Sequence, residues 1–184
     1  MATTSIDIDV HADQAWAVIA EPTTYPRWLV GTQRILAIDP GFPSRGTSFR
    51  HEVGVGPFRL RDVSTVIESH PRNRRLVLQV RARPVIGAAT VEMSVLAARV
   101  GGARVTIKEV PRRILGSVLL APLAERMIKA RNARSLANLR DLLEVPGVLP
   151  ELPAVAAAGD ELPTAPRARG RRATRAHRPR VATT

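Results

Sequence analysis

Residues 15–31 read AWAVIAEPTTYPRWLVG, and the interpretation of the whole chain starts from this stretch. Its first half carries apolar residues at helical spacing and predicts a short amphipathic helix. Pro22 and Pro26 then bracket a second helical turn that contains Tyr25. Tyr25 and Trp28 are two of only six aromatic residues in the chain. They form either a buried plug beneath a loop or the lip of a pocket.

The segments on both sides of this stretch alternate polar and apolar residues, as half-buried strands do. Before it, TSIDIDV at residues 4–10 places Ile6, Ile8 and Val10 on one side. After it, turn-like segments rich in glycine and proline separate six further predicted strands. These are RILAID (34–39), TSFRHEV (47–53), FRLRDVSTVIES (58–69), RLVLQVRAR (75–83), ATVEMSVLAA (89–98) and ARVTIKEV (103–110). Seven strands with short connections predict one antiparallel sheet.

A long helix, from about Ser117 to Leu143, is predicted to end the folded part. Ser117 is in position to cap its N-terminus, and Pro122 bends the helix or delays its start. One apolar stripe runs along it, made of Ile128, Leu136, Leu139, Leu142 and Leu143. Asn132 lies within this stripe, where an apolar residue is expected.

Residues 144–184 are rich in proline, alanine and arginine and predict a disordered tail. Residues 144–165 hold four acidic residues and no base, and residues 166–184 hold seven arginines and no acid. The arginines favour a weak anionic partner, such as nucleic acid, through counterion release. The alternative is a solvated tail without a specific partner. The net charge of +12 rests on 26 arginines and two lysines, a bias typical of genome composition, so it indicates no binding surface.

Several classes of site are not indicated. The chain has no cysteine and four scattered histidines, so we expect no disulfide, thiolate or metal site. No phosphate-binding loop or nucleophile elbow occurs, and no cofactor is expected. No apolar run approaches the roughly 18 residues of a membrane span, so no stable membrane insertion is expected. The N-terminus lacks signal-peptide features, which predicts a cytoplasmic location. The oligomeric state is not indicated.

The order strand, two short helices, six strands and long C-terminal helix is that of the helix-grip fold. Four segments carry a resemblance to a known family: AWAVIAEPTTYPRWLVG (15–31), PGFPSRGTSF (40–49), HPRNRRLVLQV (70–80) and ARNARSLANLRDLLE (130–144). In these segments the chain resembles the START-like SRPBCC superfamily, in particular its polyketide cyclase/dehydrase and lipid transport branch. Glu21 stands where that family usually has aspartate.

The resemblance covers roughly residues 3–143 and implies an α+β fold, a curved seven-stranded antiparallel sheet around the long helix. It divides the chain into a START-like ligand-binding domain at 1–143 and the tail at 144–184. It also implies a deep cavity between sheet and helix, which family members use for lipids, sterols, polyketides or other apolar ligands. Some members cyclise or dehydrate them. The short helices usually flank the entrance, which would place Tyr25 and Trp28 at the mouth. Alternatively, Trp28 packs under the loop and anchors it.

Strand alternation selects the side chains that face this cavity. It places His51 and Glu109 on the inner face and leaves Glu92 outside. The predicted ligand-binding residues are Tyr25, Trp28, Phe49, His51, Met93, Glu109, Ile128 and Asn132.

Strand 58–69 changes parity, with Phe58 and Leu60 facing inward before the change and Val63 and Ile67 after it. A bulge near Asp62 would explain this, and would turn its carboxylate either way.

A buried polar group without a partner costs about 1–3 kcal/mol, so these groups are hydrogen-bonded or directed at a ligand. His51 and Glu109 could serve as general base and acid on an enolisable carbonyl, which makes them the candidate catalytic residues. Alternatively, His51 is a satisfied core residue, Glu109 pairs with Arg112 or Arg113 at the surface, and Asn132 meets a water.

Three functions follow, in this order. The first is binding of a small hydrophobic ligand, and the second is a cyclase or dehydratase that uses the same cavity. The third is binding of nucleic acid or an acidic partner through the arginine-rich tail. Whether the chain is an enzyme stays open at this point.

Overall fold

The computed structural model of the chain describes residues 1–55, 58–82, 87–98, 101–111 and 121–145. The elements follow the predicted order, which confirms the α+β helix-grip architecture. They are β1 (Ala2–Ile8), α1 (Ala12–Ile19), η1 (Pro22–Thr24), α2 (Tyr25–Trp28), β2 (Thr32–Ile38), β3 (Ser48–Val55), β4 (Phe58–His70), η2 (Pro71–Asn73), β5 (Arg75–Ala82), β6 (Gly87–Ala97), β7 (Ala103–Pro111) and α3 (Ala121–Glu144).

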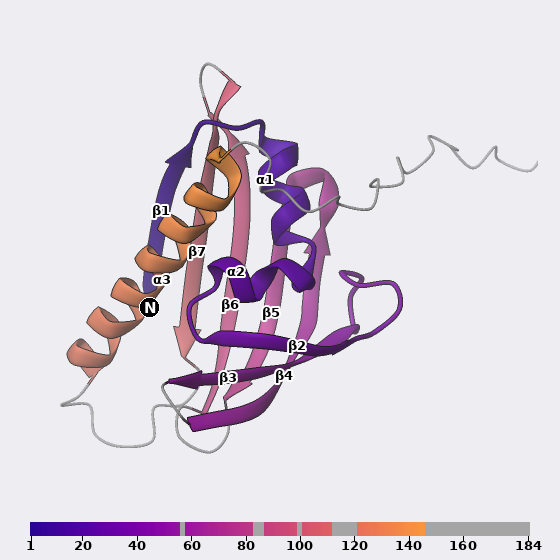
Figure 1. Cartoon of the computed structure of the whole chain (residues 1–184), viewed down its shortest axis with the longest axis vertical. Helices are drawn as coiled ribbons and strands as arrows, with labels where there is room; N and C mark the ends of the chain where they lie inside the picture. The colour runs from indigo at the N-terminus through magenta and orange to yellow at the C-terminus, as the bar shows by residue number, and fades with distance from the viewer. Residues whose placement is uncertain (56–57, 83–86, 99–100, 112–120, 146–184) are drawn as a thin grey trace, which may run out of the picture.

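The seven strands form one antiparallel sheet in the order β1-β7-β6-β5-β4-β3-β2. The sheet is strongly curved. Its strands β2 and β3 run across the direction of β5, β6 and β7 (Figure 1). Helices α1, α2 and α3 all lie on the same side of it. This arrangement gives the sheet a concave inner face, covered by helices, and an outer face.

The stretch 15–31 forms α1, η1 and α2 for local reasons. The side chain of Glu21 caps η1, since its Oε1 accepts from the backbone N–H of Thr23 at 3.0 Å and from its hydroxyl at 2.7 Å. Pro22 is the first residue of η1, a position where its missing N–H costs nothing. The carboxylate of Glu21 therefore fixes the start of η1.

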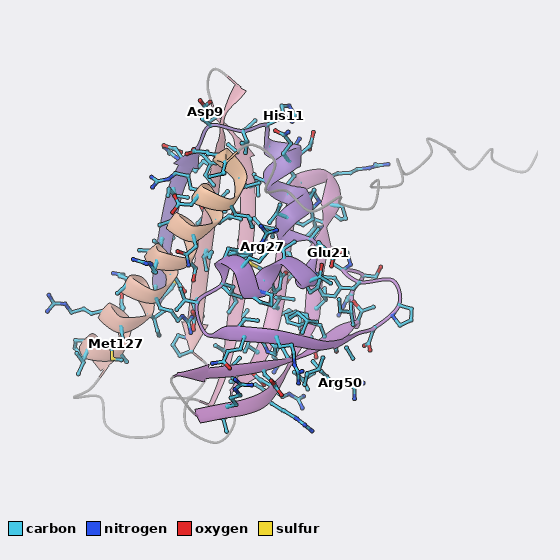
Figure 2. The ribbon with its side chains drawn as sticks, in the orientation of Figure 1. Asp9, His11, Glu21, Arg27, Arg50 and Met127 are labelled. Atoms are coloured by element: carbon cyan, nitrogen blue, oxygen red, sulfur yellow. The ribbon has the colours of Figure 1, made fainter. Side chains whose placement is uncertain are left out.

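Helix α3 buries the predicted stripe, but not evenly. Its later turns bury Asn132, Ser135, Leu136, Leu139, Leu142 and Leu143. Its first turns are less buried, since Leu123 is exposed and Ile128 is half-buried. Met127 is also exposed and points away from the sheet (Figure 2). The helix begins at Ala121, just before Pro122. Ser117, the predicted cap, lies outside the described residues, as do residues 146–184, so the disordered tail stays a prediction.

The change of parity predicted within β4 does not occur, so the inward placement of Val63 was wrong. Asp62, Ser64 and Val66 are buried and share the inner face with Leu60, the register partner of Val53, whereas Val63 lies on the outer face and is 38% exposed. The pairing of β3 with β4 is regular from Ser48 to Val55, so no bulge occurs near Asp62. The irregularity falls instead between Val66 and Glu68, in the pairing with β5. Asp62 therefore points to the inner face without ambiguity.

Glu92 lies on the outer face, as predicted, and forms one of the ion pairs found there. Arg75 of β5 contacts Glu68 at 2.6 Å and Glu92 at 3.1 Å. The hydrogen bond from Arg75 lowers the pKa of Glu92 below its ordinary value. These partners lie on neighbouring strands β4, β5 and β6, so the pairs stabilise the middle of the sheet from outside.

Candidate ligand site on the inner face

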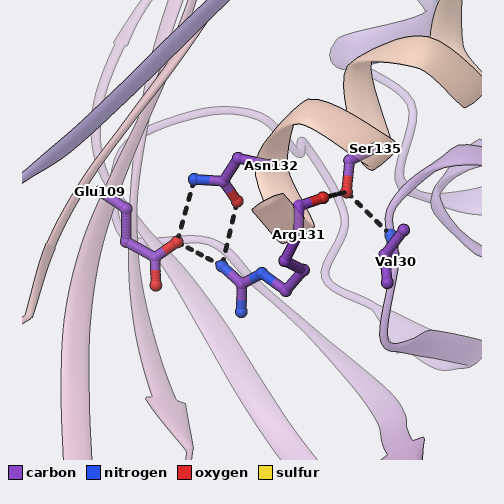
Figure 3. Close-up of polar contacts among 5 residues, drawn as sticks. All are labelled: Val30, Glu109, Arg131, Asn132 and Ser135. Carbon is purple, nitrogen blue, oxygen red and sulfur yellow. Dashed lines mark hydrogen bonds and ion pairs between the residues drawn. The ribbon is translucent and has the colours of Figure 1, made fainter. Parts of the chain in front are cut away.

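The inner side of α3 carries one buried amide among its leucines. Asn132 is 1% exposed, and its Nδ2 donates to Oε2 of Glu109 at 3.4 Å. Glu109 lies on β7, 5% exposed, and also accepts a hydrogen bond from Nη2 of Arg131. That nitrogen donates in addition to Oδ1 of Asn132 at 3.2 Å, which closes a three-residue group that we call the Glu109 cluster (Figure 3). Arg112 and Arg113, the partners considered from the sequence, lie outside the described residues.

A second set of contacts joins α3 to the segment after α2. Oγ of Ser135 accepts from the backbone N–H of Val30 at 3.0 Å and donates to the carbonyl of Arg131 at 3.0 Å (Figure 3). One turn later, Nδ2 of Asn138 donates to the carbonyl of Trp28 at 3.3 Å. The helix is therefore hydrogen-bonded both to β7 and to the end of α2.

Tyr25 and Trp28 are a buried plug. Tyr25 is 0% exposed, and its hydroxyl donates to the carbonyl of Ile19 at 2.7 Å. Burial, and then the charge of Glu21, raise the pKa of Tyr25 well above its ordinary value. Trp28 is 1% exposed, and its Nε1 donates to Oγ1 of Thr24 at 3.2 Å. Their burial supports the alternative in which the aromatic pair anchors the loop, and neither ring is exposed at a lip.

An aromatic row leads from this plug into the inner face of the sheet. The ring centroids of Trp28 and Tyr25 lie 5.4 Å apart, and those of Tyr25 and Phe49 lie 5.3 Å apart. Phe49 in turn lies 4.9 Å from His51. All three contacts are edge-to-face, the arrangement that aromatic quadrupoles prefer. Trp28 therefore packs against Tyr25, Tyr25 against Phe49, and Phe49 against His51.

His51 lies in a buried polar group with two residues of β4. It is 4% exposed, and its register partner across the strands is Asp62. Nε2 of His51 lies 3.5 Å from Oγ of Ser64 and 3.7 Å from Oδ2 of Asp62. Oδ1 of Asp62 accepts from the backbone N–H of Val63 at 2.7 Å. We call His51, Asp62 and Ser64 the His51 cluster.

The His51 cluster is not a serine–histidine–aspartate relay. In such a relay the carboxylate contacts one ring nitrogen and the serine the other. Here Asp62 and Ser64 both face Nε2. Nδ1 of His51 is buried without a hydrogen-bond partner among the described residues. An unpaired buried nitrogen is costly, and it marks a place that a ligand can satisfy.

The apolar residues between the two polar clusters are incompletely covered. Val80 is the register partner of both Ser64 and Ala89, and Val91 is the register partner of Glu109. Because residues directly opposite each other share a face of the sheet, Val80, Ala89 and Val91 lie on the inner face. All three are only half-buried, and we call them the inner row. The inner face thus offers an accessible apolar surface between the two polar clusters.

The structure does not bring His51 and Glu109 together as a catalytic pair. They lie on β3 and β7, with β4, β5 and β6 between them. Four interstrand steps amount to roughly 19 Å along the sheet. His51 meets Asp62 and Ser64, whereas Glu109 meets Arg131 and Asn132. The two residues therefore belong to separate polar clusters on the inner face.

The remaining predicted contact residues take different places. Met93 is buried within the core, next along β6 from the inner row, and Ile128 is half-buried on α3. The sequence interpretation missed Ser64 and Ser135. Ser64 shares the parity of Asp62 and Val66, a signal obscured by the assumed bulge. Ser135 lies one turn after Asn132 on the same stripe, so a stripe drawn by position rather than hydrophobicity would have included it.

An open groove of about 1030 Å³ lies elsewhere, where β1 ends beside the last turn of α3. Its charged side chains largely pair with one another. Arg104 binds Asp7 at 2.7 Å, and Arg140 lies 3.5 Å from Asp141. It shares no residue with either polar cluster, so we do not take it as the ligand site.

Within the described ranges, no group of three His, Cys, Asp or Glu side chains is arranged to hold a metal ion. In the same part of the chain, no helix combines the length and apolar character needed to cross a membrane.

A family model described as polyketide cyclase / dehydrase and lipid transport matches residues 2–144. A search of curated protein sequences gives no match. Among solved structures, the di-domain ARO/CYC BexL from the BE-7585A biosynthetic pathway is similar, with a TM-score of 0.64 and 18% identity. The match covers 76% of this chain and 45% of BexL, so the chain spans about half the length of that protein.

Two further structures match over nearly their whole length. XoxI from Bacillus cereus has a TM-score of 0.62 and 15% identity, with 78% of this chain and 96% of XoxI covered. The protein NE0264 from Nitrosomonas europaea has a TM-score of 0.59 and 17% identity, with 77% and 92% covered. At these identities the likeness is one of fold.

Proposed function

Since the chain belongs to the polyketide cyclase / dehydrase and lipid transport family, we propose that it binds a small hydrophobic ligand on the inner face of its sheet, beneath α3. The observation that carries the proposal is the inner row, apolar and only half-buried, between two buried polar clusters. Apolar contact with this surface would contribute about 25 cal/mol per Å² removed from water. The polar clusters would orient the ligand, as few well-placed polar groups do in apolar sites.

Filling the inner row should weaken binding strongly. The Val80→Trp variant places a large ring where the ligand would lie, and we expect its affinity for N-phenylnaphthylamine, a neutral fluorescent probe, to fall at least about tenfold. Val63→Trp is the matched control, because Val63 is on the outer face of the same sheet, 38% exposed. It should bind the probe like the wild type.

Native mass spectrometry of protein purified from the producing cells, followed by solvent extraction, would identify the natural ligand. The expected result is one apolar molecule per chain, absent from Val80→Trp. A wild-type chain that carries no passenger and takes up no probe would refute the proposal.

The His51 cluster favours a second candidate, an enzyme of the cyclase or dehydratase type. A buried imidazole with an open nitrogen beside a carboxylate can take a proton from an enolisable carbonyl compound, and Asp62 would stabilise the imidazolium that forms. His51→Ala separates the two functions. In an enzyme it removes turnover of such a substrate and changes affinity little, whereas in a carrier there is no turnover to lose and only affinity changes.

A further inference from the structure

The two ring nitrogens of His51 have different surroundings. Nε2 faces two oxygens, Oγ of Ser64 at 3.5 Å and Oδ2 of Asp62 at 3.7 Å. Nδ1 has no partner in the part of the chain that the structure describes, although His51 is more than nine-tenths buried. Oδ2 of Asp62 also lacks a hydrogen-bond partner there. The N–H of a neutral ring is therefore placed at Nε2, where acceptors exist.

With its proton at Nε2, the ring presents a lone pair at Nδ1. The free position on His51 is thus a hydrogen-bond acceptor. It would be satisfied by a donor on the ligand.

The His51 cluster has aromatic and apolar neighbours. The ring centroid of Phe49 lies 4.9 Å from that of His51, and Val80 of the inner row is the register partner of Ser64. A flat apolar ligand with one hydroxyl would fit this combination. We propose that His51 accepts, through Nδ1, a hydrogen bond from the hydroxyl of a phenolic or enolic ligand. This rests on the proposed function, and it adds the chemical class of the ligand.

Asp62 acts here as a positioning residue. Its carboxylate, together with Ser64, keeps the N–H of His51 at Nε2 and so keeps the acceptor at Nδ1. An amide oxygen can do the same, whereas an alkyl group cannot. Asp62→Asn should therefore retain the preference for a hydroxyl, and Asp62→Leu should lose much of it.

The test compares β-naphthol with its methyl ether, which have the same ring system but differ in the O–H donor. Titration calorimetry on the full chain should show that the wild type prefers β-naphthol by about tenfold. His51→Phe removes the acceptor and keeps a flat ring. It should bind both probes alike, with the affinity for the methyl ether within about twofold of the wild type.

A second measurement needs no variant. Nitrogen NMR of the wild type should show the tautomer with the proton at Nε2, and the signal of Nδ1 should move when β-naphthol is added. A ring protonated at Nδ1, or at both nitrogens, would overturn the inference, as would equal affinity for the two probes. In those cases both probes still bind and the proposed function stands. If neither probe binds, and N-phenylnaphthylamine does not either, the proposed function fails and this inference with it.

Discussion

Trp28→Ala should lower the free energy of unfolding by about 3–5 kcal/mol, the largest effect expected from one side chain of this protein. Trp28 is 1% exposed and packs edge-to-face on Tyr25. Truncation leaves a cavity beneath α2, removes the partner of the Tyr25 ring and leaves Oγ1 of Thr24 without its indole donor. A domain of this size is stable by only about 5–15 kcal/mol, so much of its stability is at stake.

Urea denaturation followed by circular dichroism measures this loss, with Trp28→Phe as the matched control. Phenylalanine keeps an aromatic ring against Tyr25 and gives up the N–H donor, so a loss of about 1–2 kcal/mol is expected. A Trp28→Ala chain that loses less than about 1 kcal/mol and yet no longer binds N-phenylnaphthylamine would contradict the plug. Such a result would instead indicate that Trp28 lies at the mouth of a ligand site.

Arg131→Met should cost about 2 kcal/mol, the second largest effect. The change keeps an unbranched side chain of good helix propensity but removes the cation that faces the buried carboxylate of Glu109. Removing one partner of a fully buried ion pair costs about 3–5 kcal/mol. The arginine side chain is 41% exposed, so water can partly replace it and the cost is smaller.

A double-mutant cycle separates the pair from the rest of the helix. In Glu109→Gln a neutral amide replaces the carboxylate. Adding Arg131→Met to this variant should therefore cost much less stability than it does in the wild type, with a coupling energy between the two residues of about 1–2 kcal/mol. Arg134 is exposed on the same helix and provides the control, because Arg134→Met should change stability by no more than about 0.5 kcal/mol. Costs that add in the double variant would show that Arg131 and Glu109 do not interact energetically.

The sequence predicted the fold well because its signals are local. Alternation in TSIDIDV and ARVTIKEV, with glycine and proline at the turns, marks strands whose partners follow from short connections. The helical stripe of Leu136, Leu139, Leu142 and Leu143 needs only its period to be recognised. Each of these patterns arises because one face of the element is buried, so the pattern alone is enough to predict the element.

The site was harder to predict because its signals are not local. Alternation correctly placed His51 and Glu109 inside, and the helical stripe placed Asn132 there, but neither pattern says which of these residues meet. The pairing of His51 with Asp62 depends on the register of β3 and β4, and that of Glu109 with Arg131 depends on where α3 crosses β7. Val63 misled the parity argument, because it is an apolar side chain on the outer face that stays partly exposed. Tyr25 and Trp28 were ambiguous for a related reason, since an aromatic pair beside a loop suits a plug and a lip equally well.

The uneven burial of α3 has a consequence for the kinetics of ligand exchange. Detaching its last turns would expose leucines such as Leu139 and Leu142, at about 1.5–3 kcal/mol each, whereas Leu123 and Met127 in its first turns are already in water. The first turns can therefore separate from the sheet at small cost, and chain segments of this kind move within nanoseconds to microseconds. If the proposed ligand lies beneath that half of the helix, it would leave while the core stays folded. Its residence time would then be set by its own contacts with the inner face and would not depend on how slowly the protein unfolds.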